Sequence, residues 1–115
     1  MKRGEVWTAA GGGDYAGKPR PVVILQDDRF DANDSVTICG FTTELVDAPL
    51  VRIAIAPSSL NGLDEPSQVM VDKITTVQRR RLRAQMGRLD DADMIRVTRA
   101  ILVFLGYGGF LRDPS

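Results

Sequence analysis

The apolar run Pro21-Val22-Val23-Ile24-Leu25 limits the possible folds more than any other part of the chain. It is continuous and of strand length, so it predicts a β-strand. The residues that lead into it, Pro19-Arg20-Pro21, favour extended backbone on both sides of the arginine, because proline fixes its own φ and disfavours a helical residue before it. The sequence therefore predicts that Arg20 stands at the entrance of a strand.

Several other short segments also have strand character. Residues 4–8 and 35–42 are rich in residues that favour strands, and residues 50–56 alternate apolar and other side chains. Residues 67–76 and the alternating run 81–86 predict strands with one face in water. The predicted connections are a glycine-rich loop over residues 9–19, a polar turn over residues 27–34, and a loop or short 3₁₀ turn over residues 57–66.

A single helix is predicted after these strands. Asp90 can cap its first turn, Asp91 and Asp93 suit its positive end, and Gly106 is a residue that commonly ends a helix. Its apolar side chains fall near one stripe, which must pack on other elements: Met94, Val97, Thr98, Ile101, Leu102 and Leu105.

Together these elements predict a mostly β fold, a compact antiparallel barrel of six or seven short strands with a C-terminal amphipathic helix. A chain of 115 residues is long enough to bury one core and too short to divide into two. We expect a single domain over residues 1–110, followed by a frayed tail over residues 111–115.

The charges of the chain are unevenly distributed. The formal net charge is +0, which argues against bulk electrostatic coating of nucleic acid. Residues 1–72, however, carry 6 basic and 11 acidic side chains, whereas residues 73–99 carry 8 basic and 3 acidic ones. One segment could therefore face phosphate groups.

The expected location is the cytosol. The basic start of the chain is followed by Glu5 and three glycines rather than by the apolar segment of a signal peptide, and no apolar run approaches the roughly 20 residues of a membrane helix. The single cysteine, Cys39, has no partner for an internal disulfide, which fits a reducing compartment. We expect a soluble, cytoplasmic protein without membrane association.

The chain has no histidine and one cysteine, which excludes Ser-His-Asp and Cys-His nucleophiles, zinc sites and two-histidine RNA hydrolysis. Asp27, Asp28, Asp31 and Asp34 lack the spacing and central glycine of an EF-hand, and their usual role is in loops. The glycines at 11–13 match neither a Walker A loop nor a dinucleotide fingerprint, and predict a flexible flap. We expect no metal and no cofactor.

Three features could bind an anion, and each also has an ordinary explanation. Arg20 is fixed between two prolines and would lose little freedom on meeting a phosphate, although most exposed arginines are only solvated. The triplet Thr42-Thr43-Glu44 ends a strand with polar groups, as a β-edge threonine pair also would. The run Arg79-Arg80-Arg81-Leu82-Arg83 could bind phosphates, but its alternation is typical of a strand with a solvated face.

Five elements follow one another along nearly the whole chain: Arg3-Gly4-Glu5-Val6-Trp7, Lys18-Pro19-Arg20-Pro21-Val22-Val23-Ile24-Leu25, Cys39-Gly40-Phe41-Thr42-Thr43, Ser67-Gln68-Val69-Met70-Val71-Asp72-Lys73-Ile74, and Arg81-Leu82 with the terminal helix. In these elements the sequence resembles the MazF/PemK family, the toxins of bacterial toxin-antitoxin pairs. The Arg-Pro-Val-Val element alone would be weak evidence, but the ordered set is specific.

This resemblance implies a compact antiparallel, SH3-like barrel, a homodimer, and sequence-selective cleavage of single-stranded RNA. It also implies a cognate antitoxin whose extended acidic tail fills the RNA groove. The catalytic residues of the family match Arg20 and Thr42 here. The ribose 2′-hydroxyl would be the nucleophile, so that the products are a 2′,3′-cyclic phosphate and a 5′-hydroxyl, and DNA is spared.

The remaining site assignments are substrate contacts. We assign these contacts to residues near the matched elements: Asp14, Lys18, Thr43, Glu44, Lys73 and Arg79. Of these, either Asp14 or Glu44 could take the 2′-proton. The chain departs from the family in its short glycine-rich loop, where a Glu-Gln pair is common, and at Lys73, where some members have glutamine. The preferred RNA sequence therefore cannot be transferred from a relative.

The alternative is a toxin of the CcdB type, which shares the fold and binds DNA gyrase without catalysis. That activity resides in a C-terminal helix that ends in an apolar tripeptide with tryptophan. This chain ends in Leu111-Arg112-Asp113-Pro114-Ser115 and has its single tryptophan at Trp7, which disfavours gyrase binding.

Overall fold

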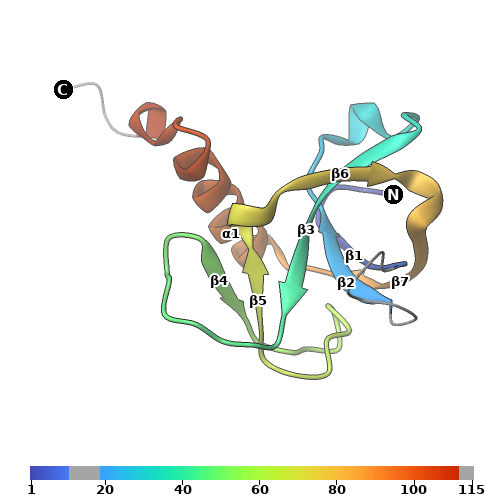
Figure 1. Ribbon diagram of the computed structural model, residues 1–115, viewed down its shortest axis with the longest axis horizontal. Coiled ribbons are helices and arrows are strands. Elements are labelled where there is room, and N and C mark those ends of the chain that lie inside the picture. Colours follow the sequence, from blue (N-terminus) through green and yellow to red (C-terminus); the bar gives the residue numbers. More distant parts are fainter. Residues whose placement is uncertain (11–18, 112–115) are drawn as a thin grey trace.

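Seven strands and one long helix make up the computed structural model, which describes residues 1–10 and 19–111 (Figure 1). The strands are β1 (Glu5–Ala9), β2 (Arg20–Ile24), β3 (Ser35–Thr42), β4 (Arg52–Ile55), β5 (Ser67–Met70), β6 (Thr75–Gln78) and β7 (Leu82–Arg88). The helix is α1 (Asp91–Phe104), and the short 3₁₀ helices are η2 (Asp28–Phe30), η3 (Val71–Lys73), η4 (Arg79–Arg81) and η5 (Gly108–Leu111). The predicted flap at residues 11–13, Asp14 and Lys18 lie outside the described residues, as does residue 112 onward.

The strands form one antiparallel sheet in the order β4-β5-β3-β2-β1-β7. Strand β3 is its centre: β2 pairs with one edge, and the other edge is shared by β6 at residues 35–38 and β5 at residues 41–42. The predicted fold class, a mostly antiparallel sheet with a C-terminal helix, is confirmed. The sheet is not closed into a full barrel, however, because no ladder joins β4 to β7 or β6 to β7 within the described part of the chain.

Strands β2 and β3 lie between two apolar cores. Val22 and Ile24 face the core that also contains Ala9, Val36, Ile38 and Leu82. The alternate residues Val23 and Leu25 face the core under the helix, with Cys39, Phe41, Val69 and Val97. Successive side chains of a strand point to opposite faces, so a strand buried on both faces must be apolar at every position. This arrangement explains the continuous apolar run of the sequence.

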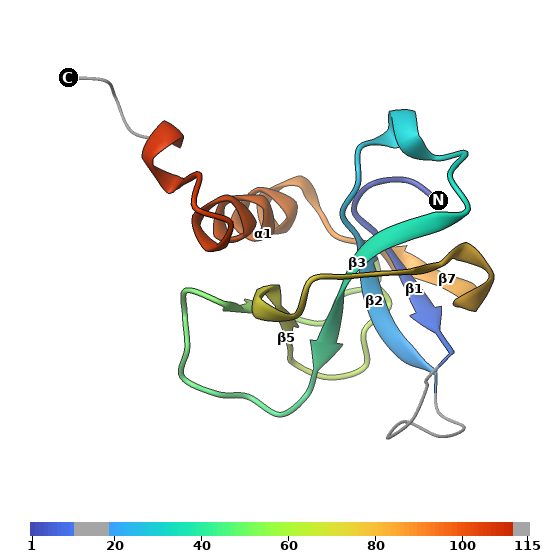
Figure 2. The same ribbon diagram turned by 45° about the horizontal axis from the view of Figure 1, so that its top comes forward.

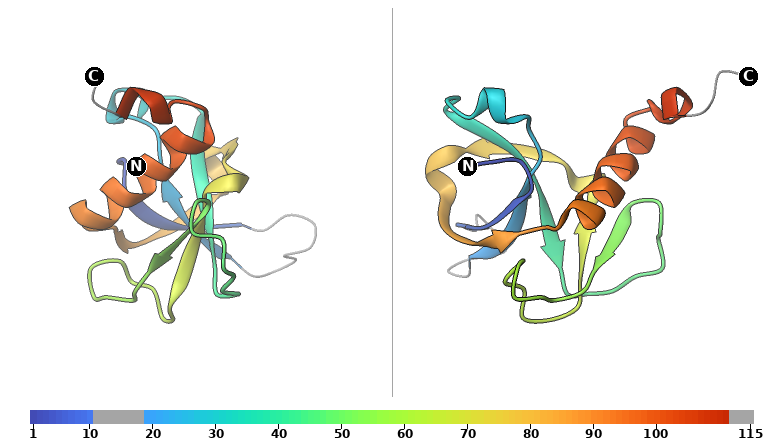
Figure 3. Two further views of the ribbon diagram at one scale, coloured as in Figure 1. Left: turned by 90° about the vertical axis from the view of Figure 1, so that its left-hand side faces the viewer. Right: turned by 180° about the vertical axis from the view of Figure 1, so that it is seen from behind.

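Helix α1 covers one side of the sheet, where it packs on β4 and η3 (Figures 2 and 3). Asp90 caps it as predicted, since its carboxylate accepts a hydrogen bond from the Asp93 N–H at 2.7 Å. Gly106 follows the helix with a φ of 89°, and the Tyr107 N–H donates to the Leu102 carbonyl at 2.7 Å, the geometry of a glycine-terminated helix. Neither α1 nor any other helix among the described residues is long and apolar enough to cross a membrane.

The predicted apolar stripe of the helix is right at its centre and wrong at its end. Val97 is fully buried and Met94 and Ile101 pack beside it, but Leu105 is exposed because the sheet does not extend that far. Thr98 is part of a polar contact instead, in which the Arg3 guanidinium donates to its hydroxyl and to the Leu25 carbonyl. That arginine therefore connects the start of the chain, the end of β2 and the helix.

Most predicted strands differ from the observed ones by one or two residues at an end, and two of them meet a 3₁₀ helix. The segment predicted as one strand over residues 67–76 is interrupted by η3 between β5 and β6. The strand expected to begin at Arg81 begins at Leu82, because residues 79–81 form η4. In both places the chain turns from one part of the sheet to another, which a periodic pattern does not reveal.

The cap of α1 gives a stability prediction. Asp90→Ala removes the acceptor of the Asp93 N–H and should lower the free energy of unfolding by about 1 kcal/mol, the usual effect of losing an N-cap side chain. Urea denaturation followed by circular dichroism measures this loss. Asp64→Ala, at an exposed loop position, is the matched control and should unfold like wild type. Equal midpoints for all three proteins would contradict the role of the cap.

A second prediction concerns Cys39, which lies in the core under the helix. Burial, with a smaller effect from the Asp72 charge, raises the pKa of its thiol from 9.0 to about 12. The folded state therefore keeps the proton, and the stability that this provides is present below pH 9 and is lost as the pH rises toward 12. At pH 8.5 iodoacetamide should alkylate the unfolded chain in urea at least tenfold faster than the folded protein. Equal alkylation rates in the two states would contradict the buried position.

Candidate functional site

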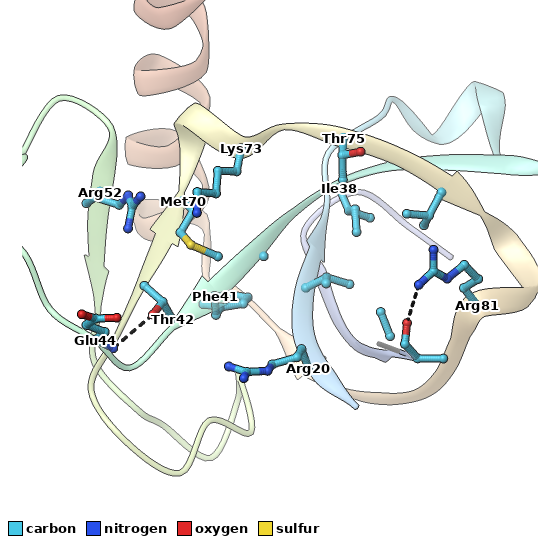
Figure 4. Close-up of a pocket in the computed structure, with 15 residues that line it drawn as sticks. Arg20, Ile38, Phe41, Thr42, Glu44, Arg52, Met70, Lys73, Thr75 and Arg81 are labelled. Carbon is cyan, nitrogen blue, oxygen red and sulfur yellow. Dashed lines mark hydrogen bonds between the residues drawn. The ribbon is translucent and has the colours of Figure 1, made fainter. Parts of the chain in front are cut away.

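A groove of about 650 Å³ lies where the ends of several strands converge (Figure 4). Its floor continues the face of β2 and β3 that carries Val22 and Ile38, and toward the ends of these strands apolar side chains give way to polar ones. The residues that line it are Ala9, Ala10, Arg20, Val22, Ile38, Gly40, Phe41, Thr42, Glu44, Arg52, Met70, Lys73, Thr75, Val77 and Arg81. Four of them are cationic and one is acidic, so the groove suits an anionic ligand.

Arg20 and Thr42 are brought together by the pairing of β2 with β3. The register places Val22 opposite Gly40, and its continuation by two residues places Arg20 opposite Thr42. Both residues are on the face that lines the groove, since each is separated by two positions from Val22 or Gly40. In Figure 4 the Arg20 guanidinium extends along the groove toward Thr42. Arg20 and Thr42, which the resemblance matches to the catalytic residues of the family, therefore line the same groove.

A backbone hydrogen bond orients the Thr42 hydroxyl. The Glu44 N–H donates to Thr42 Oγ1 at 3.1 Å, drawn as a dashed line in Figure 4. Because this bond occupies a lone pair of the oxygen, the hydroxyl hydrogen remains available as a donor toward the groove. Glu44 also lines the groove, whereas the adjacent Thr43, assigned to substrate binding from the sequence, is exposed and does not line it.

Opposite Thr42, the wall of the groove contains Lys73 and an arginine that the sequence analysis did not select, Arg52. The Arg52 side chain is 16% exposed and its Nε and Nη2 donate to Asp72 at 3.1 and 3.3 Å. The hydrogen bond from Arg52 holds the pKa of the Asp72 carboxyl below its ordinary value of 3.8. Arg52 was missed because the alternation of residues 50–56 does not show that the polar face of β4 meets Asp72 of η3.

The three consecutive arginines of η4 have three different environments. A 3₁₀ helix has three residues per turn, so adjacent side chains point about 120° apart. Arg81 lines the groove and its Nη2 donates to the Ala10 carbonyl at 3.0 Å, while Arg80 donates to the side chain of Gln78. Arg81 is thus a second groove cation that sequence reasoning did not assign.

Arg79, which we had assigned to substrate binding, lies outside the groove. Its Nε donates to the Asn33 carbonyl at 2.8 Å, and its Nη1 is 3.4 Å from Asp31. Asp31 is also 3.1 Å from the N-terminal ammonium of Met1, and this contact, as the main cause, lowers the pKa of the Asp31 carboxyl. The position of Arg79 is therefore that of a structural cation that fixes the loop between β2 and β3.

The aspartates of that loop also have structural partners. Asp27 accepts a hydrogen bond from the Arg29 N–H at 2.9 Å, which lowers the pKa of its carboxyl, and Asp28 accepts one from the Arg3 N–H at 2.7 Å. Within residues 1–10 and 19–111, no group of three or more acidic, cysteine or histidine side chains could hold a metal ion.

Two known proteins are similar in sequence to this chain over more than nine tenths of its length. A probable endoribonuclease MazF of Mycolicibacterium smegmatis is 56% identical over 109 residues, which are 95% of this chain and 100% of that protein. An endoribonuclease MazF of Staphylococcus saprophyticus is 30% identical and covers 92% of each chain.

Solved structures share the fold. The Mycobacterium tuberculosis toxin MazF-mt6 aligns with a TM-score of 0.74 at 24% identity, over 88% of this chain and 95% of that one. An endoribonuclease in complex with its cognate antitoxin, from a mycobacterial species, aligns with a TM-score of 0.76 at 23% identity, over 92% and 95%. The model of the PemK-like, MazF-like toxins matches residues 2–105. This chain therefore belongs to the PemK-like, MazF-like toxins of type II toxin-antitoxin systems.

Proposed function

We propose that this chain is the endoribonuclease of a toxin-antitoxin pair, and that it cleaves single-stranded RNA in the cytoplasm by attack of a ribose 2′-hydroxyl on the adjacent phosphate. The observation that carries the proposal is the meeting of Arg20 and Thr42 in one cationic groove. Since RNA supplies the nucleophile itself, the protein needs only to position the phosphate and to stabilise the charge that develops on it.

In this mechanism the 2′-oxygen forms a bond to phosphorus while the bond from phosphorus to the 5′-oxygen breaks. The 5′-oxygen leaves with the bonding electrons and takes up a proton from water, so that the products are a 2′,3′-cyclic phosphate and a 5′-hydroxyl. Arg20 contacts the non-bridging oxygens, where a guanidinium can donate two parallel hydrogen bonds. Thr42 donates its hydroxyl hydrogen to the same phosphate, in the orientation set by the Glu44 N–H.

The 2′-proton must pass to a base, and an arginine is unsuited to that role because its guanidinium group stays protonated at neutral pH. Glu44 is the acidic side chain among the described groove residues. Asp14, the other carboxyl that we consider, lies outside the described part of the chain. We therefore assign transition-state stabilisation to Arg20 and Thr42, and leave proton removal to one of these two carboxylates.

The same groove suits an acidic protein segment. We propose that a cognate antitoxin inhibits the chain by laying an extended acidic tail along Arg20, Lys73 and Arg81, which would exclude RNA. We further propose a homodimer, because α1 and the segment after it expose a group of large apolar side chains that a partner subunit could cover: Ile95, Val103, Phe104, Leu105 and Tyr107.

The first prediction for this site concerns Arg20. Arg20→Ala should lower the single-turnover rate of RNA cleavage by about 10²-fold to 10³-fold, as expected for the loss of one preorganised donor to a developing oxyanion. Arg20→Lys should restore only part of the rate, because it keeps the charge and loses the planar fork. Arg29→Ala, at an exposed position on η2, is the matched control and should cut like wild type. An Arg20→Ala protein that binds RNA weakly but cuts bound RNA at the normal rate would contradict the catalytic role.

A second prediction concerns metal ions and pH. Cleavage of a mixed-sequence RNA should persist in excess EDTA, and its rate should have no inflection near the histidine pKa of about 6.5, since the chain has no histidine. The ends should map as 2′,3′-cyclic phosphate and 5′-hydroxyl. Activity lost in EDTA and restored by magnesium would refute the proposed mechanism.

A further inference from the structure

We propose that Arg52, held by Asp72, recognises one nucleobase of the bound RNA and favours a base with two neighbouring acceptor atoms. This inference rests on the proposed function, because it places single-stranded RNA in the groove. It adds a specificity-determining residue at the end of the groove opposite Arg81.

The Arg52 guanidinium is fixed along one edge and available along another. Its Nε and Nη2 donate to the two carboxylate oxygens of Asp72, at 3.1 and 3.3 Å, which fixes the plane of the group. Its Nη1 has no hydrogen-bond partner within the described residues, and the side chain lines the groove. An arginine prepared in this way presents two parallel N–H donors, one from Nη1 and one from Nη2, to a ligand in the groove.

The charge of Asp72 favours a base rather than a phosphate as the ligand of Arg52. A phosphate would be attracted by Arg52 but repelled by the carboxylate beside it, so the pair offers little net charge. Lys73, on the same wall, has no carboxylate partner among the described residues and is the better phosphate contact. The N–H donors of Arg52 nevertheless keep a fixed direction in this pair, and the edge of a neutral base is recognised by hydrogen bonds of defined direction.

The floor beside Arg52 is formed by Gly40 and Met70. Gly40 lies between Ile38 and Thr42 on the groove face of β3, and a Cβ atom at this position would lie 3.2 Å from the Met70 methyl group. The Met70 methyl group therefore packs over Gly40, in the space that a larger side chain would need, and a thioether makes favourable contacts with aromatic rings. Met70 is also the register partner of Arg52, so the thioether and the donors are adjacent. A base packed on Met70 would belong to a nucleotide close to the phosphate that we assign to Thr42.

Base chemistry then restricts the choice. Two parallel donors match guanine, which presents O6 and N7 side by side, or cytosine, which presents O2 and N3. On the corresponding edges of adenine and uracil, donors alternate with acceptors, so one N–H of Arg52 would face another donor. We therefore expect guanine or cytosine at one position of the bound RNA, and adenine and uracil to be disfavoured there.

The test is binding of a randomised pool of single-stranded 2′-fluoro RNA, which carries all four bases but lacks the nucleophile and cannot be cut. Sequencing of the bound fraction should show one position enriched in guanine or cytosine by about tenfold or more, the usual discrimination of a bidentate contact. Arg52→Ala should remove the preference at that position and leave the others, and Arg52→Lys should restore it only in part. Arg29→Ala, which removes an arginine from the Asp27 pair outside the groove, should leave every preference unchanged. If the enriched base is guanine, RNA with 7-deazaguanine at that position should bind the wild-type protein more weakly than RNA with guanine. The Arg52→Ala protein should bind both RNAs equally. This result would distinguish recognition of guanine from recognition of cytosine.

The substitution Asp72→Asn distinguishes recognition of a base by Arg52 from electrostatic attraction of Arg52 to the RNA. It removes a negative charge and loosens Arg52, so RNA of every sequence should bind more tightly while the preference at the one position falls. A pool with no guanine or cytosine preference in wild type, or an Arg52→Ala protein whose affinity falls equally for all sequences, would overturn the inference. Cleavage of unmodified RNA is measured in parallel. A wild-type protein that binds selectively but does not cut counts against the proposed function and supports the role of Arg52.

Discussion

The burial of β2 and β3 on both faces is the constraint on which the rest of the structure depends. Val22 and Ile24 complete one core and Val23 and Leu25 the other, so the two cores meet at a single pair of strands. Because both faces are occupied, residues 22–25 are all apolar, and polar side chains stand beyond them. That is where Arg20 and Thr42 lie, at the margin where the core opens into the groove. The candidate site thus lies at the edge of the core, where strands rather than loops position Arg20 and Thr42.

The charges show how a chain with a net charge of +0 can present a cationic groove. Away from the groove, some cations are paired with carboxylates: Asp31 contacts the N-terminal ammonium and Arg79, and Asp93 is 3.0 Å from Arg96. In the groove, Lys73 and Arg81 have no carboxylate partner among the described residues. Exposed ion pairs contribute little to stability, typically 0–1 kcal/mol. In the groove, four cationic side chains stand beside one acidic side chain, which favours an anionic ligand there.

Much of the fold followed from local patterns. The boundaries of β3, the cap of α1 and its terminating glycine were predicted because each depends on a few adjacent residues. Arg20 and Thr42 were selected by the resemblance to a toxin family, and their meeting depends on a strand register that no local pattern contains.

The errors share a physical origin in places where the chain changes direction. A 3₁₀ turn sends Arg79 to Asp31 and Arg81 to the groove, although strand alternation would have placed both on one face. Arg52 is on the polar face of β4, and that face meets Asp72 of η3 and forms a wall of the groove. Side chains on such turns and edges are positioned by tertiary contacts that the sequence does not display.

Burial on both faces also has a consequence for the accuracy of folding. In most sheets a slip of one residue exposes apolar side chains to water, but a slip of β2 against β3 would only exchange Val and Ile between two apolar cores. Hydrophobicity therefore protects this register poorly. Hydrogen bonds near the loop between β2 and β3 fix the register instead. The Gln26 side chain accepts a hydrogen bond from the Thr37 N–H at 3.1 Å and donates one to the Phe30 carbonyl at 3.1 Å. A glutamine remote from the groove thus helps to determine which residue faces Arg20, and a chain with a shifted register could be compact, folded and without a site.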